Sequence, residues 1–211
     1  MLRMSRKNIQ YLTAHEHQKI IDALGDESNM LTFRDRAIGK IAVNYGMRSG
    51  DIANLKMDSI DWGRDIISIT QQKTQQPLEL PLLAAVGNAI YDYIDKERPA
   101  SDSAALFLTQ KAPYRNISGE GVWRVSESIM NMVGIRQAKG DTKGFHLSRH
   151  HLVTSLMGKE VQQPVISAIA GHISPGSIEK YSYADHVHLK KCSLSMERYP
   201  VSLEVLADAK V

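Results

Sequence analysis

Apolar side chains recur every three or four residues through most of this chain, which is the period of a helix that buries one face. After Thr13, which forms a capping-box pattern with Glu16, this period predicts a helix from Ala14 to Leu24. A second periodic stretch, from Phe33 to Tyr45, is followed by Gly46, a residue type that often ends helices. The same reasoning predicts a short helix beginning near residue 49 and further helices over residues 82–97, 119–132, 145–157, 164–170 and 174–181.

The pattern changes at residues 66–70, where the β-branched run Ile-Ile-Ser-Ile-Thr is typical of a strand. Residues 71–76 are polar, and residues 78–80 alternate apolar and polar side chains. We therefore predict a small antiparallel hairpin with Lys73 near its tip. Residues 136–144 are polar, basic and glycine-containing, which indicates a loop. The expected fold class is α+β and mainly α-helical, with a small antiparallel β-sheet.

Composition narrows the class of protein without assigning a function. The chain has 211 residues, 43% of them hydrophobic, which is enough to bury one sizeable core. A single cysteine, Cys192, excludes an internal disulfide and a thiol-rich metal site, and it suits a cytoplasmic location. No apolar run could cross a membrane, and the basic start of the chain lacks the apolar core of a secretory signal. The net charge of +3 permits nucleic-acid binding without requiring it.

Arg48 follows the helix-ending Gly46 and precedes Asp51 by three residues. A guanidinium can donate paired hydrogen bonds to a phosphate, and a neighbouring carboxylate can hold it in that orientation. Taken alone, the pair is more typical of a surface arginine at the start of a helix. Lys73, taken alone, is equally typical of a solvated lysine on a turn.

The last third of the chain adds further groups that could handle phosphate. His146 and Arg149 stand three residues apart on a predicted helix, so they share a face and suit a common anion. A Gly-His pair ends at His172, and Tyr181, a possible nucleophile, follows nine residues later. Each of these features has a purely structural alternative, such as a buried turn tyrosine. Only their joint occurrence indicates phosphodiester chemistry.

In order and spacing, these motifs resemble those of the tyrosine recombinase (phage integrase) family over residues 11–185. The resemblance implies an integrase-type catalytic domain that binds phosphate through two arginines and two histidines, carries a lysine on a hairpin, and uses a tyrosine nucleophile. Asp51 matches the acidic position that usually follows the first arginine. The catalytic positions that match are Arg48, Lys73, His146, Arg149, His172 and Tyr181.

The chain departs from the family pattern at several places. Ser148 stands before Arg149, and Ala170 stands before Gly171, where leucine is common in both positions. Tyr183 is a second candidate nucleophile, although the spacing from His172 favours Tyr181. Family members usually carry an additional helical DNA-binding domain, whereas only about ten residues precede the first predicted helix here. That domain is therefore either absent by nature or missing because the chain is a fragment.

The resemblance also implies a reaction and its partners. Tyr181 would attack double-stranded DNA to form a 3′-phosphotyrosine, with His146 accepting a proton and Lys73 donating one, and without a metal or cofactor. Residues 186–211 would form a tail that docks on a neighbouring subunit of a tetramer, and residues 1–10 a basic arm. Neither a membrane nor a small-molecule substrate is expected. An inactive DNA-binding relative and a type IB topoisomerase-like enzyme stay open as alternatives, as does the choice among integration, excision and inversion. The basic residues available for phosphate contacts are Arg3, Arg6, Lys7, Arg136, Lys139 and Lys143.

Overall fold

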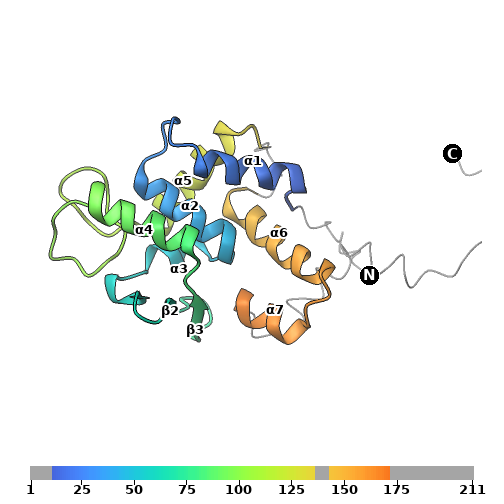
Figure 1. The fold of residues 1–211 in the computed structure, drawn as a ribbon. Helices are drawn as coiled ribbons and strands as arrows, with labels where there is room; N and C mark the ends of the chain where they lie inside the picture. Colours follow the sequence, from blue (N-terminus) through green and yellow to red (C-terminus); the bar gives the residue numbers. More distant parts are fainter. Residues whose placement is uncertain (1–10, 136–142, 172–211) are drawn as a thin grey trace, which may run out of the picture.

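Helix α2 (Phe33–Tyr45) is the central element of the fold in the computed structural model, which describes residues 11–135 and 143–171 (Figure 1). Buried residues, which include Arg34 and Arg36, occupy nearly its whole circumference, so it is covered on several sides at once. Four longer helices pack against it, in addition to the short α3 (Ser49–Ala53): α1 (Ala14–Gly25), α4 (Ala84–Lys96), α5 (Gly119–Met132) and α6 (Phe145–Gly158).

Local sequence signals set the helix ends as expected. At the start of α1, Thr13 Oγ1 accepts a hydrogen bond from the Glu16 amide at 3.2 Å, and the Glu16 carboxylate accepts one from the Thr13 amide at 2.8 Å. This is the predicted capping box. At the end of α2, Gly46 adopts a left-handed conformation with φ 60° and closes the helix. The predicted helices within the described residues are confirmed, with ends that agree to within about two residues.

The small sheet is antiparallel, with strand order β1 (Ile60–Asp61), β2 (Ile66–Thr70), β3 (Pro77–Pro81). Ile67 pairs with Leu80 and Ile69 with Leu78, so the inward-facing apolar residues of the hairpin lie opposite one another. The predicted hairpin is confirmed. Strand β1 was not expected, because two residues are too short to show an alternating pattern. It follows a short 3₁₀ helix, η1 (Met57–Ser59).

Two short helices bring distant parts of the chain to the lower half of Figure 1, close to the hairpin. Helix α3 (Ser49–Ala53) packs against α5, and α7 (Gln163–Ala170) contacts both α6 and β3. A small apolar cluster joins α6 to α7 and is separate from the main core. Within the described ranges, no helix is long and apolar enough to cross a bilayer. The predicted arm (1–10), most of the predicted loop (136–142), the helix expected at 174–181 and the tail (186–211) lie outside the described residues.

Ser148, one of the departures from the family pattern, is fully buried in α6. Its hydroxyl has no hydrogen-bond partner in the part of the chain that the structure describes. A buried hydroxyl without a partner costs free energy, so Ser148→Ala is expected to raise the free energy of unfolding by about 1 kcal/mol, measured by urea denaturation. Ser126 is the matched control because it is equally buried and its hydroxyl donates to the Trp123 carbonyl at 2.6 Å. A loss of stability in Ser148→Ala as large as that in Ser126→Ala would contradict the prediction.

His17 on α1 stacks on His151 of α6, with ring centroids 4.2 Å apart and an interplanar angle of 23°. The Nδ1 atom of His151 lies 2.7 Å from the Leu12 carbonyl oxygen, which adds a second link between this helix and the start of α1. Burial, and then the charge on His151, lower the pKa of His17. The folded state therefore takes up a proton at His17 less readily than the unfolded chain does.

The sign of the resulting pH effect follows from this lowered pKa. The contribution of His17 to stability is complete above about pH 6.5, the usual histidine pKa, and is lost as the pH falls through the lower pKa of the folded state. The melting temperature should therefore drop less between about pH 7 and pH 5 in His17→Phe, which keeps a stacking ring, than in the unmodified protein. The exposed His15 provides the control, His15→Phe. Equal pH slopes in His17→Phe and the unmodified protein would refute this prediction.

Candidate active site

Arg149 extends from α6 and links the ends of two other helices. Only 6% of the residue is exposed. Its Nη1 donates to the Gly46 carbonyl at 2.8 Å, just beyond the end of α2, and its Nη2 donates to the carbonyl of Ala170, the last residue of α7. Carbonyl groups at the carboxyl ends of helices lack partners within the helix and carry partial negative charge. The guanidinium supplies those partners and joins α2, α6 and α7.

Arg48 approaches the same end of α7 from another direction. It is the residue before α3, and its Nη2 donates to the Gly171 carbonyl at 3.4 Å. Arg48 and Arg149 therefore bind the carbonyls of two consecutive residues, 170 and 171. The fold brings together two arginines that are far apart in the sequence, as the candidate phosphate site requires.

The two arginines differ in exposure and in their remaining hydrogen-bond capacity. The side chain of Arg48 is 20% exposed, and its Nη1 lies 3.7 Å from Asp51 Oδ2, a distance that gives charge attraction but no hydrogen bond. This Nη1 has no hydrogen-bond partner among the described residues. Arg48 thus lies beside Asp51, as expected for an arginine that only stabilises the start of a helix. It is not, however, a surface arginine. It keeps a donor that no described residue uses, although this Nη1 atom is itself buried.

Asp51 connects this site to the hairpin. It is 3% exposed, and its Oδ1 accepts a hydrogen bond from the Gln72 amide at 2.8 Å while its Oδ2 faces Arg48. One carboxylate therefore orients the guanidinium and also holds the backbone of the turn between β2 and β3. Lys73, the next residue on this turn, is exposed, which leaves its ammonium accessible to a ligand.

The remaining predicted site residues are less closely defined. His146 lies on α6, one turn before Arg149, and is exposed while Arg149 is buried. The two therefore differ in environment although they were expected to share a face. His172, Tyr181 and the competing Tyr183 lie outside the described residues. Their roles stay predictions.

Two parts of the site were not predicted from the sequence. One is the pair of main-chain carbonyls at 170 and 171, which bind both arginines but have no side-chain signature. The other is Gln71, a buried turn residue whose neighbours on the turn are mostly exposed. No periodic signal marks a single buried glutamine in a polar run. The sequence signal for this region is Gly171, because a glycine after a helix often adopts the left-handed conformation found here, with φ 57°.

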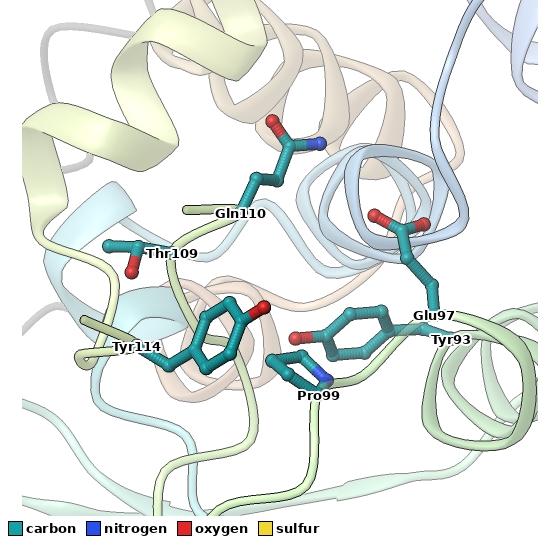
Figure 2. A pocket seen from close by; sticks show the side chains of 6 residues that line it. All are labelled: Tyr93, Glu97, Pro99, Thr109, Gln110 and Tyr114. Carbon is teal, nitrogen blue, oxygen red and sulfur yellow. The ribbon is translucent and has the colours of Figure 1, made fainter. Parts of the chain in front are cut away.

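A separate pocket of about 220 Å³ lies at the other end of α2 (Figure 2). Glu97 lines it and accepts a hydrogen bond from the Arg34 amide at 3.1 Å, at the start of α2, whereas Arg48 follows the end of that helix. Its walls are tyrosine and proline rings, polar side chains and this carboxylate, which would repel a phosphate.

Within the described ranges, no cluster of histidine, cysteine and acidic side chains could hold a metal ion. The arginine pair is therefore the candidate site for an anion.

Similarity to known proteins identifies the family to which the chain belongs. Residues 10–188 match the phage integrase family. The protein y4gC of Sinorhizobium fredii, assigned to the integrases/recombinases, is 32% identical over 169 residues, which cover 80% of this chain and 86% of that protein. Tyrosine recombinase XerA of Pyrococcus furiosus is 23% identical over 181 residues, which cover 85% of this chain and 59% of XerA.

The fold is also shared with a solved structure. The XerH site-specific recombinase, crystallised as a post-cleavage complex with a palindromic difH substrate, superposes with a TM-score of 0.75 at 22% sequence identity. The match covers 90% of this chain and 54% of XerH, so this chain spans just over half the length of that recombinase. The family match covers most of the chain, and the protein therefore belongs to the phage integrase family, that of the tyrosine recombinases.

Proposed function

We propose that this protein cuts and rejoins double-stranded DNA at specific sites through a covalent phosphotyrosine intermediate at Tyr181. The observation that carries the proposal is the meeting of Arg48 and Arg149 at the consecutive carbonyls of residues 170 and 171. This arrangement concentrates two permanent positive charges, with the Asp51 carboxylate 3.7 Å from the Arg48 guanidinium. Because the protein belongs to the phage integrase family, a DNA phosphodiester is the anion that we expect at this site.

The two arginines would stabilise the transition state electrostatically. Attack on a phosphodiester builds negative charge on its nonbridging oxygens, and donors already held in place lower the energy of that charge without reorganising. The Arg48 side chain is 20% exposed and retains a buried donor atom without a partner among the described residues, so we assign it the contact with phosphate. Arg149 supplies positive charge from a buried position and holds the helix ends that surround the site.

In the proposed reaction, the hydroxyl oxygen of Tyr181 attacks phosphorus and the bond from phosphorus to the 5′-oxygen breaks. His146 accepts the phenol proton, and Lys73 donates a proton to the departing 5′-oxygen. The product is a 3′-phosphotyrosine and a free 5′-hydroxyl. Because the covalent link conserves the phosphodiester energy, a second 5′-hydroxyl can reverse the step on another strand without ATP. The arginines and histidines supply the required charge, so the scheme needs no metal or cofactor.

Exchange of two duplexes requires four cuts, and we therefore propose four copies of the chain on paired DNA sites. Residues 186–211 are our candidate for the segment that docks on a neighbouring copy, and residues 1–10 for a basic arm on the phosphate backbone. Because DNA affinity would come mainly from phosphate contacts, it should fall with rising salt concentration. A DNA substrate and a single cysteine agree with a cytoplasmic location.

A nicked suicide substrate tests this function directly. Cleavage beside a nick releases a short oligonucleotide, so rejoining fails and the covalent complex accumulates. Since the target site is unknown, the protein is incubated with a pool of nicked duplexes of random sequence and analysed on denaturing gels. We expect a DNA-linked band. DNA retention without any such band would indicate an inactive DNA-binding relative. Relaxation of supercoiled DNA without recombinant junctions would indicate topoisomerase-like chemistry.

A further inference from the structure

Gln71 is buried although it belongs to an exposed turn. It follows the last residue of β2 and is 3% exposed, whereas Gln72, Lys73, Gln75 and Gln76 are all exposed. A glutamine side chain loses conformational entropy and hydration when it is buried, so its burial at this place requires compensating contacts. Two sets of contacts supply them.

The first set closes the turn itself. Thr74 Oγ1 donates to Gln71 Oε1 at 2.7 Å. The Gln71 amide donates to the Gln76 carbonyl at 2.9 Å, and the Gln75 amide donates to the Gln71 carbonyl at 2.8 Å. Both the side chain and the main chain of Gln71 therefore bind residues that flank Lys73. The side-chain amide of Gln71 is fixed with respect to the lysine backbone.

The second set joins the turn to α7. The side-chain amide of Gln71 lies directly on Gly171, and a Cβ atom placed on that glycine would overlap with the Oε1, Nε2 and Cδ atoms of Gln71. The absence of a side chain at Gly171 is thus required twice, for the φ of 57° and for the approach of Gln71. The same Gly171 provides the carbonyl that binds Arg48.

We propose that Gln71 is a positioning residue that fixes the Lys73 turn against the end of α7, and thereby sets the place of Lys73 relative to the arginine pair. The hydrogen bond from the Gln72 amide to Asp51 forms a second, parallel link between the turn and Arg48. Loss of the Gln71 side chain would remove the link to Gly171. The turn would then be held less firmly, by the Gln72 amide, by the Gln72 side chain beside Gly50 and by the contacts of β3 with α7. The inference rests on the proposed function, in which Lys73 protonates the leaving 5′-oxygen.

A substrate that needs no proton on its leaving group separates this role from a general structural one. If sulfur replaces the bridging 5′-oxygen, the bond from phosphorus to sulfur breaks and the electron pair leaves as a thiolate. A thiolate is a far weaker base than an alkoxide, so it departs without a proton donor. With ordinary nicked DNA, Gln71→Ala is expected to slow formation of the covalent complex by about 10- to 100-fold, since small displacements of a reacting group have effects of this size. With the 5′-thio substrate, its rate should return to within about threefold of the unmodified protein.

Gln76→Ala is the matched control, because Gln76 is an exposed glutamine on the same turn. It should cleave both substrates at the rate of the unmodified protein. Gln71→Glu, which keeps the length of the side chain and an oxygen to accept from Thr74, should retain more activity on ordinary DNA than Gln71→Ala. Equal slowing of Gln71→Ala on both substrates, or no slowing on either, would overturn the positioning role.

A measurement without DNA tests the placement of Gln71 independently of the reaction. Hydrogen exchange of the full chain should become faster in Gln71→Ala at residues 71–76 and also at residues 168–171, because the contact joins these segments. It should be unchanged at both in Gln76→Ala. Faster exchange confined to the turn would refute the coupling. If the unmodified protein forms no covalent complex, the proposed function fails, while this measurement still decides whether Gln71 links the turn to α7.

Discussion

Replacing Tyr181 by phenylalanine is expected to abolish the covalent protein–DNA complex completely. The change removes only the hydroxyl oxygen, which attacks phosphorus in the proposed reaction, and no other atom of the side chain can form the ester bond. The measurement is the fraction of labelled nicked DNA that migrates with protein on a denaturing gel. Binding of the same DNA, measured without denaturant, should be nearly unchanged because the phosphate contacts are retained.

Tyr183→Phe is the matched control for this substitution. Tyr183 lies two residues beyond Tyr181 and is the same residue type, so it tests whether the spacing from His172 identifies the nucleophile correctly. Tyr183→Phe should form the complex at close to the normal rate. If Tyr181→Phe still forms the complex and Tyr183→Phe does not, then Tyr183 is the nucleophile and our assignment is wrong.

Arg149→Ala is expected to affect both reactivity and stability. Loss of a preorganised positive donor should slow cleavage by about a hundredfold to a thousandfold. The same change leaves the carbonyls of Gly46 and Ala170 without their guanidinium partner and creates a cavity, so we expect the free energy of unfolding to fall by about 2–4 kcal/mol. Single-turnover cleavage rates and urea denaturation measure the two effects.

The two effects of Arg149 can be separated with a second buried arginine. Arg36 is 7% exposed, and its Nη1 donates to the carbonyls of Ala23 and Leu24 at 3.3 Å, away from the candidate site. Arg36→Ala should destabilise the protein comparably, but at a temperature where it stays folded it should cleave at close to the normal rate. Arg149→Lys keeps the charge but lacks the planar fork that reaches two carbonyls, so it should recover only part of the activity. Equal cleavage defects in Arg36→Ala and Arg149→Ala would show that Arg149 acts through stability alone.

The helices were predictable because their signals are local. The Thr13–Glu16 capping box and the glycine after Tyr45 act within one turn of chain, and the structure confirms both. The hairpin was predictable for the same reason, since β-branched residues, a polar turn and an alternating strand follow one another directly. Strand β1 has only two residues and is defined by its pairing with β2, so no local pattern could reveal it.

The family was also predictable, because its motifs combine residue type with order and spacing. The tyrosine recombinase family, the mainly helical fold class and the recombinase class of enzyme are confirmed by the family match and the related structures. The individual catalytic roles are not tested by these comparisons. Among the described residues, the structure strengthens the case for Arg48 and Arg149 by placing them together, and it leaves the parts assigned to Lys73 and His146 as proposals.

By itself, the sequence determined the helical elements, the hairpin and the family, because each depends on residues close together or on a fixed pattern of types. Only the tertiary structure showed that Arg48 is partly buried, that two arginines meet at the carbonyls of residues 170 and 171, and that Gln71 rests on Gly171. These contacts join segments about a hundred residues apart through main-chain atoms and a missing side chain. Main-chain carbonyls are the same at every position, so their partners become visible only when packing brings helix ends together.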